Sequence, residues 1–218
     1  YPLSWNTGWL KNLGLEIPKT RDELVEVLTA IRDKDADGDG DATNEIPYAG
    51  GLTNGDNLAQ MVMWGYGIYS RVPGYAIYAD DNGKLILGNM TAEYKDFLTF
   101  MRKLYTEGFY ADDAAVVTGD EIKERTLNNQ YGVLSGAYDN AYVALQEERG
   151  KTVQAWIPTN SAFTANKDDA RVTVLNHPVS SNINIVASAS TEHPEVVARF
   201  LDYFFDEFGV GGDAALNG

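Results

Sequence analysis

The stretch "RDKDADGDGDATNEIP", residues 32–47, has an aspartate at every second position from Asp33 to Asp41. Calcium prefers six to eight oxygen ligands, and an EF-hand loop supplies them from alternate positions around a glycine that allows a sharp turn. Gly38 and Gly40 provide that glycine in two registers, one starting at the first aspartate and one at the next. Without a cation, carboxylates about 5 Å apart in an ordered loop repel by roughly 3 kcal/mol per pair at an effective dielectric near 20. The pattern therefore favours calcium over a solvated acidic turn, and over magnesium, which retains its waters.

The second half of this loop departs from the EF-hand pattern. Position twelve is Asn44 in the first register, and Glu45 is eleventh in the second, so neither register ends on the usual glutamate. A calcium sensor also needs a helix after the loop. Ile46 precedes Pro47 and is biased towards extended geometry. The loop is therefore expected to join a helix to a strand, with a structural rather than a sensing or catalytic metal.

The elements around the loop alternate between helices and short strands. Thr20 and Glu23 have capping-box spacing and begin an amphipathic helix, residues 20–33, that runs into the loop. Other predicted helices cover residues 56–64, 91–108, 118–128 and 139–149 and a segment that starts near Pro194. Predicted strands cover residues 131–134, 153–157, 171–175 and 183–188, and a hairpin over residues 75–87 turns at Asn82-Gly83. This alternation predicts an α/β fold.

Aromatic residues are abundant, with 13 tyrosines, 8 phenylalanines and 4 tryptophans. Two helices are expected to bury theirs. The expected buried positions are Tyr94, Phe97, Leu98, Met101, Leu104 and Tyr105 on one helix, and Phe200 and Phe204 on the last. Aromatic rings outside the helical faces suit a sugar site, because flat rings stack on apolar sugar faces. The candidate ligand-binding residues are Trp64, Tyr66, Tyr69, Tyr138, Asn140 and Trp156, with core packing and helix capping as the alternatives.

Composition and motifs exclude several classes of function. The formal net charge of −15 argues against nucleic acid as a partner. Without cysteine, no disulfide or thiolate site can form. His177 and His193 each precede a proline, which favours a turn role over catalysis, and the serine-nucleophile and phosphate-loop motifs are absent. No run of about eighteen apolar residues could span a bilayer. The start of the chain reads as the middle of a fold and its end follows directly after a predicted helix, so we expect a fragment.

Four segments carry a family resemblance. They are "WLKNLGLEIPKTRDELVEVLTAIRDKDADGDGDATNEIP", "LTFMRKLYTEGFYADD", "TGDEIKERTLNNQYGVL" and "INIVASASTEHPEVVARFLDYFF". Together they make the chain similar to the extracellular solute-binding proteins of ABC transporters, in the carbohydrate-binding group whose members carry a calcium loop. The resemblance implies a periplasmic-binding-protein-like (type II) fold, a two-lobed α/β clamp. Residues 1–173 would be most of the second lobe, with the calcium loop at 33–46, and residues 174–218 would return towards the first lobe.

The same resemblance implies a function. Such proteins are not enzymes; they bind an extracellular carbohydrate, here expected to be an oligosaccharide, and deliver it to permease subunits. They are extracellular and lipid-anchored in Gram-positive bacteria, or periplasmic in Gram-negative ones, with the anchor outside this fragment. Two alternatives remain from the residues: a calcium-stabilised extracellular carbohydrate-active enzyme, and an adhesion or interaction module.

The resemblance also suggests a metal ligand set, although the loop is one residue longer than the commonest form. Ligands would start at Asp35 rather than Asp33, and Thr43 adds to the ambiguity at the closing end. The predicted calcium ligands are Asp35, Asp37, Asp39, Asp41, Asn44 and Glu45.

Overall fold

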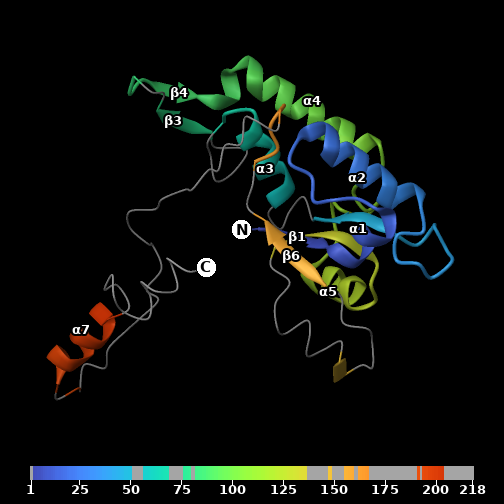
Figure 1. Cartoon of the computed structure of the whole chain (residues 1–218). Coiled ribbons are helices and arrows are strands. Elements are labelled where there is room, and N and C mark those ends of the chain that lie inside the picture. Colours follow the sequence, from blue (N-terminus) through green and yellow to red (C-terminus); the bar gives the residue numbers. More distant parts are fainter. Residues whose placement is uncertain are drawn as a thin grey trace. The chain divides into compact units, whose positions relative to one another are not determined.

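The computed structural model of the chain (Figure 1) describes residues 2–50, 56–68, 76–79, 82–136, 147–148, 155–159, 162–166, 191 and 193–203. The chain divides into two compact units, Tyr1–Val174 and Leu175–Gly218. The assignment of these segments to lobes stays a prediction. The predicted strands at 171–175 and 183–188 lie outside the described residues, as does all of the predicted helix at 139–149 except residues 147–148.

A four-stranded mixed sheet forms the centre of the first unit. Its strands are β1 (Leu3–Asn6), β2 (Ile46–Ala49), β5 (Tyr131–Ser135) and β6 (Trp156–Thr159), in the order β2-β5-β1-β6. β2 and β5 run parallel, whereas β1 is antiparallel to both of its neighbours. All four residues of β1 are buried, because both faces of this inner strand are covered. Leu3, Ser4, Trp5 and Asn6 alternate apolar and polar residues, a pattern typical of a half-buried strand, but this strand was not predicted. The buried side chains of Ser4 and Asn6 both form hydrogen bonds.

The first unit contains five described α-helices, and all but the first lie where the sequence predicts a helix. They are α1 (Thr7–Leu13), α2 (Arg21–Asp33), α3 (Asn57–Gly65), α4 (Ala92–Thr106) and α5 (Gly119–Leu127). Capping boxes form at Thr20 and Glu23 before α2, and at Thr118 and Glu121 before α5. Only α1 was not predicted; its seven residues are too few to show a clear helical period.

A predicted hairpin and a predicted C-terminal helix are also present. β3 (Ile77–Ala79) pairs antiparallel with β4 (Leu85–Leu87), and a short 3-10 helix, η1 (Gly88–Met90), follows. In the second unit, α7 covers Pro194–Tyr203. No helix within the described residues is long and apolar enough to cross a membrane.

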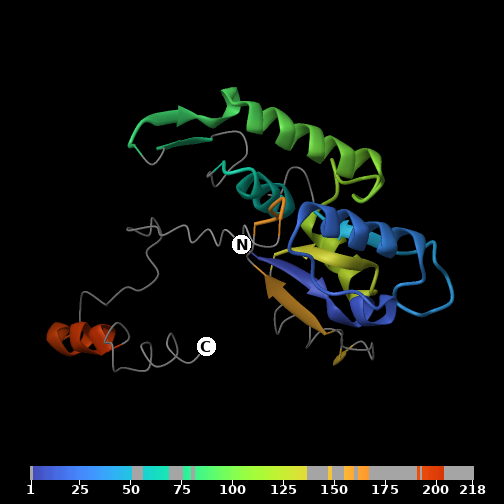
Figure 2. The ribbon, with the colours of Figure 1, turned by 45° about the horizontal axis from the view of Figure 1, so that its top comes forward.

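The core lies between the sheet and the helices, and α2 packs against β2 (Figure 2). The buried face of α2 is the predicted one: Leu24, Val27, Leu28 and Ile31. On α4 the prediction was too broad. Phe97 and Leu104 are buried, but Leu98 and Tyr105 are each 49% exposed, because they lie one position further round the helix from the buried stripe. Phe200 of α7 is 60% exposed, against the prediction, and Phe204 lies outside the described residues.

Candidate metal centre and ligand surface

The loop between α2 and β2 folds around the carboxylate of Asp35. Oδ1 of this residue accepts a 2.8 Å hydrogen bond from the Gly38 amide, and Oδ2 accepts a 3.0 Å bond from the Gly40 amide. Both glycines have positive φ, 81° and 96°, a conformation that L side chains rarely adopt. The alternation of aspartate and glycine therefore has a local cause, since Gly38 and Gly40 each direct their backbone amide to the carboxylate of Asp35.

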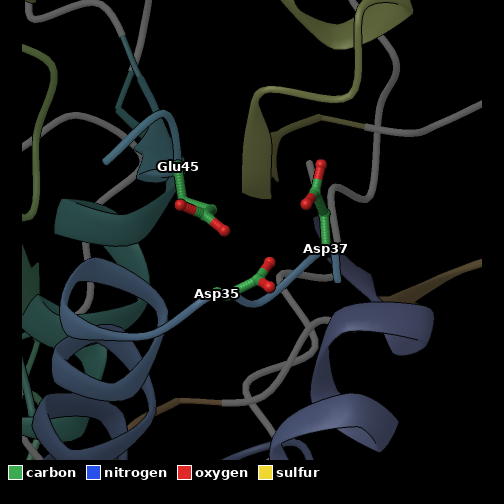
Figure 3. Close-up of side chains that lie close together, drawn as sticks. All are labelled: Asp35, Asp37 and Glu45. Carbon is green, nitrogen blue, oxygen red and sulfur yellow. The ribbon is translucent and has the colours of Figure 1, made fainter. Parts of the chain in front are cut away.

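Three carboxylates from opposite ends of the loop lie together. Oxygens of Asp35, Asp37 and Glu45 are within 4.8 Å of one another, and Figure 3 shows the side chains directed towards a common space. We call these residues the carboxylate group. Glu45 is only 8% exposed. Its Oε1 accepts a 2.8 Å bond from the Ala36 amide, whereas its Oε2 is enclosed and has no hydrogen-bond partner.

An enclosed carboxylate oxygen without a partner is costly. Burial raises the pKa of Glu45, and the negative charge of Asp37 adds to the rise. The pKa of Asp37 is also raised, first by burial and then by the charges of Asp39 and Asp35. Hard oxygen ligands that repel one another around a shared space suit a calcium ion, which would compensate their charge. The residues present therefore fit the predicted cation.

The other predicted ligands lie outside the carboxylate group. Asp39 accepts a 2.8 Å bond from the Asp41 amide and a 2.9 Å bond from Nδ2 of Asn44. The carboxylate of Asp41 accepts bonds from the amide and hydroxyl of Thr43, at 3.0 and 2.6 Å. Asp39, Asp41 and Asn44 thus form hydrogen bonds within the loop itself.

Asp33, the alternative first ligand, is occupied elsewhere. It is the last residue of α2, and Arg32 donates to both of its carboxylate oxygens, at 2.7 and 2.9 Å. Its carboxylate is also outside the carboxylate group. The geometry thus favours the register that starts at Asp35.

Sequence reasoning missed one residue at this site, Asn129. It follows the C-cap of α5, and its Nδ2 donates a 3.2 Å hydrogen bond to Oδ2 of Asp37. The only sequence signal is an asparagine just after a helix, where a left-handed residue is common. That signal indicates a turn and says nothing about a metal.

The aromatic candidates are not brought together in the described part of the chain. Trp64 belongs to α3 rather than to a loop and is only 4% exposed, so it packs in the core. Trp156 is the first residue of β6 and packs, partly buried, against a small apolar cluster. Tyr69, Tyr138 and Asn140 lie outside the described residues.

Tyr66 is the candidate that the structure holds at a surface. It caps the end of α3 and is partly buried. The guanidinium of Arg21 lies 4.2 Å from the centre of its ring, and Nη1 of the same arginine donates to the carbonyls of Gly65 and Phe163, at 3.0 and 3.1 Å. Arg21 therefore fixes the end of α3 and supports one face of the tyrosine ring.

A family model described as bacterial extracellular solute-binding protein matches residues 1–207. The chain is 40% identical, over 131 residues, to lipoprotein LipO of Bacillus subtilis (strain 168), covering 59% of this chain and 25% of LipO. It is 34% identical, over 121 residues, to the fructooligosaccharide ABC transporter substrate-binding protein FusA of Streptococcus pneumoniae serotype 4, covering 51% of this chain and 20% of FusA. The chain thus spans a quarter or less of these relatives.

Solved structures of the S. pneumoniae protein FusA are similar in fold. The complex with kestose has a TM-score of 0.62 at 24% identity, covering 78% of this chain and 33% of FusA. An EF-hand mutant of FusA in complex with fructo-nystose has a TM-score of 0.54 at 28% identity, covering 61% of this chain and 26% of that one.

Proposed function

Because this chain belongs to the bacterial extracellular solute-binding proteins, we propose that it forms part of a protein that captures an extracellular oligosaccharide for an ABC transporter permease. The predicted type II periplasmic-binding-protein-like α/β fold is confirmed by the match and by the fold of the solved neighbours. Membership also confirms the prediction of a binding protein rather than an enzyme, and removes the carbohydrate-active enzyme as an alternative.

The choice of an oligosaccharide is supported by the relatives. FusA is named for fructooligosaccharide and binds kestose in a solved structure. In this chain, Tyr66 on its arginine support offers one rigid ring of the kind that stacks on a sugar. Residues 1–173 would supply one lobe of the clamp. The name of LipO supports a lipoprotein held at the outer face of the cell membrane.

We further propose that the carboxylate group holds a structural calcium ion. The observation that carries this is the enclosed, unpartnered Oε2 of Glu45 beside the carboxylates of Asp35 and Asp37. Asp39, Asp41 and Asn44 would supply further oxygens, and the EF-hand named in the FusA structure agrees with such a loop. The ion would join the end of α2 to the start of β2. Since β2 is a strand paired with β5, the loop lacks the second helix of a sensor.

The proposed function is tested by a glycan-binding screen on the full-length protein that contains this chain, followed by calorimetry on the hits. We expect saturable binding of one class of oligosaccharide, and loss of uptake of that sugar when the gene is deleted. A protein that binds glycans while the deletion strain takes them up normally would be an adhesion or interaction module. Failure to bind any carbohydrate would overturn the proposal.

A further inference from the structure

We infer that Asn129 is a positioning residue for the calcium site, acting through Asp37; the inference rests on the proposed metal site. Asn129 belongs to the turn between α5 and β5 and is distant in sequence from the loop. Its Nδ2 lies 3.2 Å from Oδ2 of Asp37, and its Oδ1 lies 3.4 Å from Nδ2 of Asn6. One amide thus connects a carboxylate of the loop to the end of β1.

The orientation of this amide is fixed by its neighbours. An ionised carboxylate only accepts hydrogen bonds, so Asn129 must present its NH₂ group to Asp37 and its oxygen to Asn6. Oδ1 of Asn6 already accepts a 3.2 Å bond from the Trp9 amide as the N-cap of α1, which leaves its NH₂ group to donate to Asn129. The direction of both bonds follows, and Asn6, only 1% exposed, anchors them.

The same turn also holds the other end of the loop. The carbonyl of Gln130 accepts a 2.9 Å bond from the amide of Ile46, the residue after Glu45. Asn129 therefore holds Asp37, near the start of the loop. Gln130 holds Ile46, directly after Glu45 at the end of the loop. A single turn thus sets how far apart two members of the carboxylate group lie. Residues that orient metal ligands in this way commonly change metal affinity by about 10- to 100-fold.

A competing explanation is that Asn129 serves only its own backbone. It has a φ of 61°, and asparagine tolerates this left-handed conformation better than most residues. The two explanations differ for glycine, which adopts positive φ without strain but has no side chain to donate. If the backbone alone mattered, Asn129→Gly would be harmless.

The experiment compares wild-type protein with Asn129→Gly and with Asn128→Ala, a matched control that removes an exposed asparagine side chain one residue away. Calcium affinity is measured by calorimetry after chelation, and Tm is measured with and without calcium. We expect Asn129→Gly to weaken calcium binding by about 10-fold or more. Its metal-free Tm should fall only modestly, because glycine suits the positive φ whereas the buried NH₂ group of Asn6 loses Asn129 as an acceptor. Asn128→Ala should bind calcium like wild type.

A second variant tests the orientation. Asn6→Asp keeps the oxygen that caps α1 but cannot donate a hydrogen bond to Asn129. The side-chain amide of Asn129 is then no longer held with its NH₂ group towards Asp37. We expect calcium binding to weaken, but less than in Asn129→Gly. Unchanged calcium affinity in Asn129→Gly, with a wild type that binds calcium, would overturn this inference alone. A wild type that binds no calcium would overturn the metal site and the inference together.

Discussion

The hydroxyl of Tyr110 donates a 2.7 Å hydrogen bond to Oδ2 of Asp56, and the hydroxyl of Tyr48 donates a 2.9 Å bond to Oδ1 of the same carboxylate. Asp56 is also the N-cap of α3, where its Oδ1 accepts from the Ala59 amide at 3.0 Å. One carboxylate thus connects the start of α3 to Tyr48 in β2 and to Tyr110, which forms a β-bridge with Tyr48. Burial raises its pKa, which reflects the cost of enclosing a charge.

Removal of one of these donors should destabilise the fold. Tyr110→Phe keeps the ring, which is 4% exposed, but leaves Oδ2 of Asp56 without its tyrosine hydroxyl. We expect the free energy of unfolding, measured by urea denaturation at neutral pH, to fall by about 1 to 3 kcal/mol. The control is Tyr105→Phe, on a tyrosine that is 49% exposed, with an expected change within about 0.5 kcal/mol. Equal effects in the two variants would contradict the role given to Asp56.

The ion pair between Asp113 and Arg125 should make stability depend on pH in the acid range. Nη1 of Arg125 lies 2.9 Å from Oδ1 of Asp113, and this bond lowers the pKa of the carboxyl below its usual 3.8. A lowered pKa in the folded state means that the stabilisation is present above the unfolded pKa and is lost as pH falls through the folded value.

Asp113→Asn should therefore cost about 0.5 to 1 kcal/mol of unfolding free energy at pH 7, a small value because the pair is partly exposed. The difference from wild type should shrink steadily below about pH 4, as measured by urea denaturation at a series of pH values. Asp112→Asn changes the exposed neighbouring carboxylate and serves as the control. A difference that stays constant from pH 6 to pH 3 would contradict the assignment.

Glu45→Gln should abolish stabilisation by calcium. The amide keeps the shape of the side chain but replaces a charged oxygen in the carboxylate group, and removal of a buried charge should leave the metal-free protein equally or more stable. For wild type, linkage predicts about 2.7 kcal/mol of stabilisation at a calcium concentration 100 times the Kd. The measurement is Tm with and without calcium.

Asp33→Asn decides the register in the same assay. Asp33 is paired with Arg32 and lies outside the carboxylate group, so this variant should retain the calcium-induced rise in Tm. A rise that is lost in Asp33→Asn and kept in Glu45→Gln would mean that the ligands start at Asp33.

Local sequence patterns predicted most elements of the first unit because their signals are local. The capping box at Thr20 and Glu23 sets the start of α2, and the Asn82-Gly83 turn, with Gly83 at a φ of 77°, sets the hairpin. The aspartate and glycine alternation pointed to the loop for the same reason. Each of these features is decided within a few residues of the chain.

The features that the sequence did not reveal depend on contacts between distant segments. Trp64 was predicted to be a ligand residue on a loop, yet it belongs to α3, whose residues are buried nearly all round, and its ring lies in the core. Oε2 of Glu45 lacks a partner only because the loop closes over it. Asn129 meets Asp37 across the fold, through a hydrogen bond that spans 92 residues of sequence. No local sequence pattern predicts a contact between residues so far apart in the chain.

Gly65→Ala should disturb the support of Tyr66 more than a helical glycine substitution normally would. A Cβ at Gly65 would overlap the carbonyl oxygen of Phe163, which is backbone and cannot turn away, so the end of α3 must shift from Arg21 and its contacts. We expect a loss of about 1 to 3 kcal/mol in unfolding free energy by urea denaturation. Gly119→Ala, at the open first position of α5, is the matched control and should be neutral or stabilising by up to about 1 kcal/mol. Equal stability of the two variants would show that α3 tolerates a side chain at this contact and that Arg21 does not hold it rigidly.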